Sequence, residues 1–274
     1  MKTVDPPAPR RSASRLIGGG AAVLAGSVLT DSAMEHYRGS FANPAMLLPI
    51  AASGFSLAFN GVRAARGKAM AGASANHATS TAIGAAGLGF HAYNILRQPG
   101  GLTLTNLFYQ APIGSPAALV LVGTLGAAAD RIASGIGFSG PFGIGSGRLL
   151  AGYTAFGIAG TVAEAGLLHF RGAYHNPAMW LPIALPPLSA LALARAALTG
   201  RVSTITTALL AATAALGLAG SALHAWGVQR NMGGWRNWRQ NLLAGPPLPA
   251  PPAFTGLAIA GLGALLLMRR SARG

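Results

Sequence analysis

The chain has 274 residues, of which 51% are hydrophobic and only 9% are charged. Soluble domains carry about a quarter charged residues, so this composition favours an integral membrane protein over a soluble enzyme. The net charge of +15 does not indicate nucleic-acid binding, because the basic residues lie between apolar stretches and form no continuous stripe.

Apolar stretches follow one another along the chain, each near the ~20 residues that span the hydrocarbon core of a bilayer. They cover residues 16–33, 44–62, 79–96, 111–129, 149–167, 177–194, 204–226 and 250–268. Several are rich in Ala and Gly, which lets transmembrane helices pack closely. The sequence therefore predicts an all-α integral membrane protein with eight transmembrane helices. The fourth and eighth stretches begin with proline-containing segments and are the least complete.

The chain also repeats itself. The string "HYRGSFANPAMLLPI" begins at His36, and the near-copy "HFRGAYHNPAMWLPI" begins 133 residues later at His169. The same offset pairs His91 with His224 and Arg97 with Arg230, and after a two-residue insertion Asn106 pairs with Asn241. Each unit supplies four stretches, and an even number keeps both units in the same orientation. This predicts a parallel tandem duplication with a pseudo-twofold axis along the membrane normal.

The repeat sets the expected domain organisation. It comprises an N-terminal cytoplasmic tail (1–14), a first four-helix unit (15–133), a Gly-rich linker (134–147) and a second four-helix unit (148–274). The segment before the first stretch resembles a twin-arginine export signal, with Arg10 and Arg11 as the pair. Because the equivalent stretch 149–167 lies in mid-chain, we interpret 16–33 as a retained span.

The basic residues predict the orientation. Most of the 20 Lys and Arg fall on the side that holds both termini, and the positive-inside rule places that side in the cytoplasm. We therefore expect a multi-pass protein of a bacterial-type inner membrane with both termini cytoplasmic. The other side is rich in aromatic residues and holds Arg236 and Arg239 near its last Trp residues. This composition predicts contact with the lipid bilayer and with a periplasmic protein, and no nucleic-acid partner.

An Asn-Pro-Ala tripeptide occurs in both copies of the string and resembles the signature of aquaporins, which also carry it twice. The resemblance covers three residues per copy. In aquaporins the two motifs start half-helices in oppositely oriented repeats, whereas here each starts a full-length apolar stretch in parallel repeats. We therefore expect a capping role, in which Asn43 and Asn176 cap the second and sixth spans and Pro44 and Pro177 take the first helical position.

Two acidic residues match between the copies. Asp31 and Glu164 lie near the predicted outer ends of the first and fifth spans. Ionisable groups at membrane depth are costly and tend to be functional, so we predict that these two handle protons. The alternative is that they lie in the interface, solvated or paired with Arg38 and Arg171.

Four histidines match as well, and all lie near the predicted outer face. A b-type haem can be held by two histidines from neighbouring helices with arginines near its propionates, whereas a quinone needs one histidine or acid to exchange a proton. The candidate sets are His36 and His91 with Arg38 and Arg97, and His169 and His224 with Arg171 and Arg230. The alternative is an interfacial histidine bonded to backbone or water. The absence of cysteine excludes covalent c-type haem, and we expect no further metal site.

Three classes of function remain. The first is a membrane subunit of a redox or electron-transfer complex, not catalytic alone, with a quinone or haem b near the outer face and a periplasmic partner. The second is a transporter or channel for a small solute or protons, with Asp31 and Glu164 as carriers. The third is a structural membrane anchor without a ligand. The matched His, Arg and acidic residues favour the first class, and the crowding of polar residues at one face counts against the second.

Overall fold

The structure is a computed structural model that describes residues 8–68, 70–110, 112–140 and 143–271. Within these ranges the chain is helical and forms no named strand. The long helices are α1 (Ala8–Arg38), α2 (Leu47–Arg66), α3 (Ala73–Leu96), α5 (Gly114–Ala133), α6 (Ser146–Arg171), α7 (Leu181–Thr199), α8 (Thr204–Gln229) and α10 (Pro252–Ser271). The short ones are α4 (Leu104–Tyr109), α9 (Trp238–Ala244) and the 3₁₀ turns η1 (Pro44–Met46), η3 (Pro177–Trp180) and η4 (Gly234–Asn237).

Six helical segments in the described part of the chain are long and apolar enough to cross a membrane. They are Arg10–Arg38, Pro44–Arg66, Gly114–Ala133, Pro177–Thr199, Thr204–Gln229 and Pro252–Arg269. They are consistent with an α-helical membrane protein, as the composition predicts. The helices α3 and α6 are not among the six, although the sequence analysis singled out two other stretches, 111–129 and 250–268, as least complete. Polar residues inside α3, such as Asn76 and His77, lower its apolarity.

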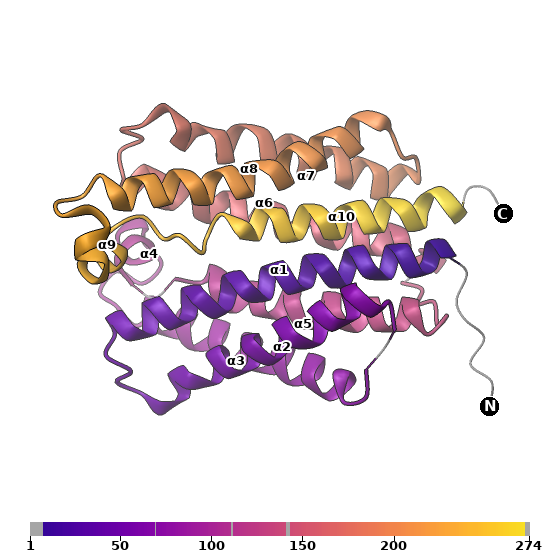
Figure 1. The fold of residues 1–274 in the computed structure, drawn as a ribbon, viewed down its shortest axis with the longest axis horizontal. Coiled ribbons are helices and arrows are strands. Elements are labelled where there is room, and N and C mark those ends of the chain that lie inside the picture. The colour runs from indigo at the N-terminus through magenta and orange to yellow at the C-terminus, as the bar shows by residue number, and fades with distance from the viewer. Residues whose placement is uncertain (1–7, 69, 111, 141–142, 272–274) are drawn as a thin grey trace.

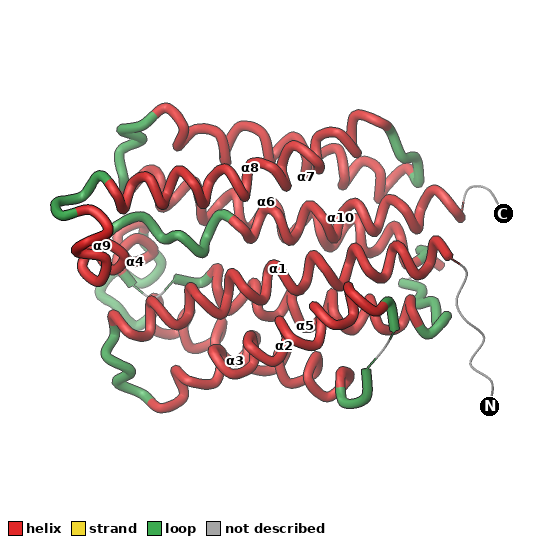
Figure 2. Tube along the Cα trace, viewed as in Figure 1, coloured by secondary structure: helices red, strands yellow, loops and turns green. Residues whose placement is uncertain are grey.

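The helices form two groups that meet along the centre of the molecule (Figure 1). One group contains α1, α2, α3 and α5, and the other contains α6, α7, α8 and α10. Helices α1 and α10 pack against each other along their length and join the groups. Loops lie mainly at the two ends of the helices (Figure 2). We call one end the α4/α9 end, after its short helices, and the other the terminal end, because the described chain begins and finishes there.

Glycine lets α1 and α10 approach to backbone contact. A Cβ atom placed on Gly256 of α10 would lie 2.7 Å from the carbonyl oxygen of Gly20 in α1 and 2.9 Å from the amide nitrogen of Leu24. Small residues of this kind drive helix packing in membranes. Fully buried Ile17 and Leu257 pack around the contact. The two groups are therefore held together by a tight central helix pair.

The outer surfaces of both groups are apolar. Large hydrophobic side chains that are mostly exposed include Phe55, Phe90, Phe156, Leu191, Leu198 and Ile205. A soluble monomer rarely exposes so many, whereas a lipid bilayer would cover them. Helices α5 and α6 also leave a groove of about 560 Å³ between them, lined by apolar residues of both helices and by Phe138 and Leu198.

Helical or hydrogen-bonded residues occur in two of the expected segments, the tail 1–14 and the linker 134–147. Helix α1 begins at Ala8, so the second half of the expected tail 1–14 belongs to the helix, and Ser14 donates a hydrogen bond to the carbonyl of Ala129 (2.8 Å). Residues 1–7 lie outside the described residues. In the linker 134–147, Phe138 N–H donates to Ser146 Oγ (3.0 Å) just before α6, so the described part of this linker is hydrogen-bonded.

Candidate functional site

Each copy of the repeated string forms the same turn at the α4/α9 end. Ser40 and Phe41 follow α1 with φ angles of 54° and 48°, and Ala173 and Tyr174 follow α6 with φ angles of 55° and 46°. Positive φ is uncommon for residues other than glycine, and two in succession are rarer still. The turn folds the chain back over the end of the helix, so that Phe41 N–H donates to the carbonyl of His36 (3.0 Å).

The Asn-Pro-Ala tripeptide starts the next helix in both copies. The side chains of Asn43 and Asn176 each accept a hydrogen bond from the backbone N–H two residues further on (2.9 Å). Pro44 and Pro177 then open the 3₁₀ turns η1 and η3, which lead directly into α2 and α7. The tripeptide therefore starts a full-length helix through a 3₁₀ turn and satisfies its first backbone donors.

The first histidine of each string closes the turn. The Nδ1 atom of His36 lies 2.6 Å from the carbonyl oxygen of Met46, and Nδ1 of His169 lies 2.7 Å from that of Met179. A carbonyl can only accept, so Nδ1 carries the proton in both rings. In a neutral imidazole, Nε2 is then left with its lone pair.

The second histidine pair is held in the same way from a different pair of helices. His91 of α3 donates Nδ1–H to the carbonyl of Pro112, and His224 of α8 donates Nδ1–H to that of Pro247 at 2.7 Å. These bonds tie the ends of α3 and α8 to the segments that lead into α5 and α10. All four matched histidines therefore have a backbone partner at Nδ1.

The histidines that were expected to form pairs lie close together. The rings of His169 and His224 have centroids 6.4 Å apart and planes at 63°. His36 and His91 lie close enough to interact electrostatically. His169 and His224 thus lie side by side at the α4/α9 end, and His36 and His91 lie within electrostatic range of each other at the same end.

The arginines have other contacts. Arg38 forms an ion pair with Glu35 and donates to the carbonyl of Leu242 in α9 (3.4 Å). Arg171 donates to the carbonyl of Phe108 in α4 at 3.0 Å and stacks over the ring of Tyr109. Each of these two arginines therefore reaches from its own helix to the short helix of the other group.

The remaining predicted arginines lie further out. Arg97 stacks over the ring of Tyr93, with its guanidinium carbon 5.8 Å from the centroid, and Arg230 is exposed. Neither has a described contact to a histidine. Arg97 and Arg230 would therefore contact a ligand at the histidine pairs only from the edge of the site.

The two matched acids lie near each other at the start of α5. Glu164 Oε1 accepts a hydrogen bond from Gly114 N–H at 3.1 Å, and Asp31 lies beside Ser115. The two carboxyl groups interact electrostatically across the boundary between the groups. The N-terminus of a helix favours negative charge, so α5 provides a natural place for both.

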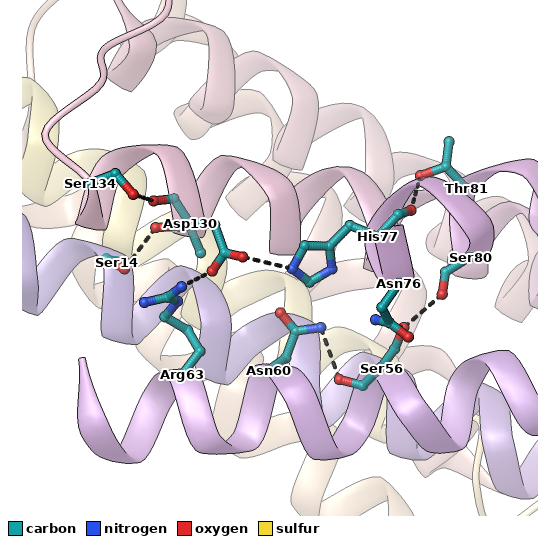
Figure 3. A network of polar contacts seen from close by, with 11 residues as sticks. Ser14, Ser56, Asn60, Arg63, Asn76, His77, Ser80, Thr81, Asp130 and Ser134 are labelled. Atoms are coloured by element: carbon teal, nitrogen blue, oxygen red, sulfur yellow. Dashed lines mark hydrogen bonds and ion pairs between the residues drawn. The ribbon is translucent and has the colours of Figure 1, made fainter. Parts of the chain in front are cut away.

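A second polar cluster, which the sequence analysis did not select, lies inside the first group of helices near the terminal end (Figure 3). Arg63 of α2 forms an ion pair with Asp130 of α5. His77 of α3 places Nε2 3.2 Å from the other carboxylate oxygen of Asp130. Only 1% of Arg63 and 3% of His77 is exposed. We call these three residues, together with Asn60, the buried cluster.

Hydroxyl and amide groups extend the buried cluster along α2 and α3. Asn60 donates to the carbonyl of Ser56 at 2.9 Å, and the hydroxyls of Ser56 and Ser80 lie 2.8 Å apart. Asn76 donates to the Ser56 hydroxyl at 3.1 Å. A row of polar groups therefore runs from the ion pair toward the middle of the helices (Figure 3).

Several atoms of the buried cluster have no hydrogen-bond partner among the described residues. They are Nε and Nη1 of Arg63, Nδ1 of His77 and Oδ1 of Asn60. Gly126 of α5 packs closely against two of these atoms, because a Cβ there would lie only 2.5 Å from His77 Nδ1 and 2.7 Å from Asn60 Oδ1. Buried polar atoms are almost always satisfied, so these four indicate an occupant.

Two features of the sequence explain why this cluster was not predicted. The residues 133 or 135 positions later in the chain are all apolar, namely Leu193, Ala196, Leu210 and Leu265, so a search for polar residues that recur at this offset passes over the cluster. The predicted spans also ended at residues 62 and 129 and began at 79, which placed Arg63, Asp130 and His77 just outside the membrane. The helices continue past those limits. The charged residues directly next to the predicted span boundaries were the signal that could have revealed the cluster.

The chain matches no protein family, no curated protein and no solved structure. Within the described residues, no three His, Asp or Glu side chains come together as a metal site. The function therefore has to be argued from the geometry of the histidine pairs and of the buried cluster.

Proposed function

We propose that the protein is a multi-pass membrane subunit of an electron-transfer complex, and that its histidine pairs at the α4/α9 end bind haem b or a quinone. The observation that carries this proposal is the shared bonding of His36, His91, His169 and His224, each of which donates Nδ1–H to a backbone carbonyl. Histidines that bind metals typically have such a second bond, which fixes the tautomer and leaves Nε2 as the ligand atom.

The separation of the rings supports a metal between them. With metal–imidazole bonds of about 2 Å on each side of an ion, two ring centroids on opposite sides lie roughly 6 Å apart. The centroids of His169 and His224 are 6.4 Å apart. Two imidazoles are too few to hold a bare ion, so His169 and His224 would bind the iron of a haem, which would supply one-electron transfer at this site.

A quinone uses the same atoms differently. A neutral imidazole with its proton on Nδ1 can accept the hydroxyl proton of a quinol at Nε2. The nearby carboxyl groups of Asp31 and Glu164 would then take part in releasing protons. Both ligands would therefore use Nε2 of the same histidines. A haem would be recognised by its absorption spectrum, and a quinone by its extraction into solvent.

We also infer that the chain is a tandem duplication whose eight long helices all span the membrane. Support comes from local geometry that recurs at the repeat offset: consecutive left-handed residues in both turns, identical asparagine caps and identical histidine bonds. The crossed contacts of Arg38 and Arg171 support a pseudo-twofold axis between the groups. The charge distribution supports cytoplasmic termini in an inner membrane.

The same orientation would place the α4/α9 end in the periplasm. Met232, Trp235 and Trp238 are exposed there, and Trp and Arg are enriched in the central contacts of protein interfaces. We therefore propose that a periplasmic electron-transfer protein binds at this end. The soluble redox domain of such a complex would be a separate chain.

The test is a reduced-minus-oxidised absorption spectrum of the full-length protein purified from its native membrane. Haem b gives paired Soret and α bands, which we expect to be lost or shifted in His224→Ala and His91→Ala. His175→Ala is the matched control. His175 is exposed, and the residue at its position in the first string is Ala42. If the spectrum is blank, solvent extraction should yield a quinone. If neither is found and liposomes show solute flux, the protein is a transporter and the proposal is wrong.

A further inference from the structure

We propose that the buried cluster is a hydrated proton-exchange site that communicates with the aqueous phase at the terminal end. The site lies at the opposite end of the helices from the histidine pairs and involves none of the residues assigned there. It therefore goes beyond the electron-transfer proposal and does not depend on it.

The fold does not require polar residues at these positions. A Cβ on Gly126 would meet His77 and Asn60, whereas a Cβ on Gly261 in α10 would meet Leu210 at 3.3 Å and Leu193 at 3.1 Å. The surroundings of the two glycines are thus geometrically alike, yet one is polar and the other is apolar. Leu193, Ala196, Leu210 and Leu265 are all buried. An apolar core fills this place in the second group, so the charges in the first group are dispensable for folding and point to a function.

The chemistry of the atoms without a hydrogen-bond partner indicates that water occupies the site. Arg63 Nε and Nη1 can only donate, and Asn60 Oδ1 can only accept. An anion would face the carboxylate of Asp130 and could not donate to Asn60, while a metal cation would face the guanidinium of Arg63. Water both accepts and donates, and buried waters typically make about three hydrogen bonds to such groups.

The exposed fractions of the side chains indicate that water reaches the buried cluster at Asp130. Its side chain is 17% exposed, compared with 2% for Arg63 and 3% for His77. Asp130 lies one turn before the end of α5, so its carboxyl group is the member of the cluster nearest to solvent at the terminal end. Arg63 holds the carboxylate in place with a charge that does not titrate in the physiological range.

The relay then needs three proton transfers. The ionised carboxylate of Asp130 can only accept at Nε2 of His77, so the resting ring carries its proton on Nε2 and has its lone pair on Nδ1. The water beside Asn60 gives a proton to Nδ1, the imidazolium passes its Nε2 proton to Asp130, and Asp130 releases it to water at the terminal end, which leaves the ring neutral in its other tautomer. One proton has entered and one has left. The hydroxyls of Ser56 and Ser80 continue the row of polar groups toward the centre of the bundle.

The charged groups that face this site come from the helices packed around α5. Arg63 reaches it from α2 and His77 from α3. From α1, Arg15 donates to the carbonyl of Ala64 at 2.7 Å, and the alkyl chain of Arg11 passes Gly67. These two arginines therefore lie against the end of α2, close to Arg63 in the chain.

Infrared difference spectroscopy of the full-length protein in lipid tests the site directly. The chain has only five Asp and Glu residues, so a carboxylic acid band can be assigned by substitution. Acidifying the buffer should produce the carbonyl-stretch band of a protonated buried acid. We expect one component of this band to shift in heavy water and to disappear in Asp130→Asn, while it persists in Asp31→Asn, Glu164→Gln and Glu35→Gln, which remove the acids at the other end of the helices.

Nuclear magnetic resonance of nitrogen-labelled histidine provides the second readout. The His77 signal should show polarisation transfer from water and a change of protonated nitrogen on acidification. The variant Arg63→Ala/His77→Leu/Asp130→Leu copies the second group at these three positions and should fold with both signals lost. The proposal is wrong if no component of the acid band is lost in Asp130→Asn, if the Asp130 component does not respond to heavy water, or if His77 has no water contact. None of these signals needs a haem or a quinone, so they do not depend on the outcome at the histidine pairs.

Discussion

Removing one charge of the buried ion pair should destabilise the protein more than removing all three ionisable residues of the buried cluster. In Asp130→Leu the guanidinium of Arg63 stays buried with no counter-charge, and breaking a buried pair in this way costs about 3–5 kcal/mol. In Arg63→Ala/His77→Leu/Asp130→Leu the charges leave together, and replacing a buried ion pair by apolar residues is often neutral or stabilising by about 1–4 kcal/mol. The triple variant introduces the Ala and Leu residues that already pack in the second group.

The thermal unfolding of both variants in detergent measures this difference. At about 2–4 °C per kcal/mol for a chain of this size class, Asp130→Leu should unfold roughly 6–20 °C below the unmodified protein. The triple variant should unfold within a few degrees of the unmodified protein or above it. The reasoning is refuted if the triple variant is the less stable of the two, because the polar residues would then be needed for folding.

Three further predictions concern single residues. Gly126→Ala should abolish the water contact of His77, because the new Cβ would lie 2.5 Å from Nδ1 and would force the ring out of its position; the same resonance measurement checks this. Gly256→Ala should push α1 and α10 apart and cost about 1–3 kcal/mol in thermal unfolding, since its Cβ would meet backbone atoms that cannot yield. Gly61→Ala is the control for both, because no atom lies within 4 Å of its Cβ position. Asn176→Ala should cost about 0.5–2 kcal/mol by removing the cap of η3, and an unchanged melting temperature would contradict that role.

The helices could be predicted from the sequence, but their ends could not. Apolar stretches locate the part of a helix that lies in hydrocarbon, whereas a helix continues for as long as its backbone bonds are satisfied. Helix α2 therefore runs to Arg66, where Gly67 ends it with a φ of 68°, and α5 runs to Ala133. The extra turn on each helix is what brings Arg63 and Asp130 into the bundle.

The members of the outer site could be predicted, but their partners could not. Comparing the two copies of the string selected His169 and Arg171 without structural information. The partner of Arg171 is a carbonyl in α4, a short helix inside what the sequence presents as a loop. Glu164 likewise binds the start of α5, fifty residues away in the chain. Such contacts depend on how the two groups dock, and no local pattern encodes that.

The two sites are close enough to influence each other electrostatically. Helix α2 runs from the turn that binds His36 to Arg63, and its rise of 1.5 Å per residue gives about 24 Å between Leu47 and Arg63. A unit charge at that distance changes the energy of another by about 0.7 kcal/mol at an effective dielectric constant of about 20. For a one-electron centre this corresponds to about 30 mV. If a haem is bound at His36 and His91, Asp130→Asn should raise its midpoint potential by that amount, because a negative charge is lost. Glu35→Gln removes a charge much nearer to His36 and should produce a larger rise. A redox titration in which Asp130→Asn has no effect, while Glu35→Gln does, would show that the two ends act separately.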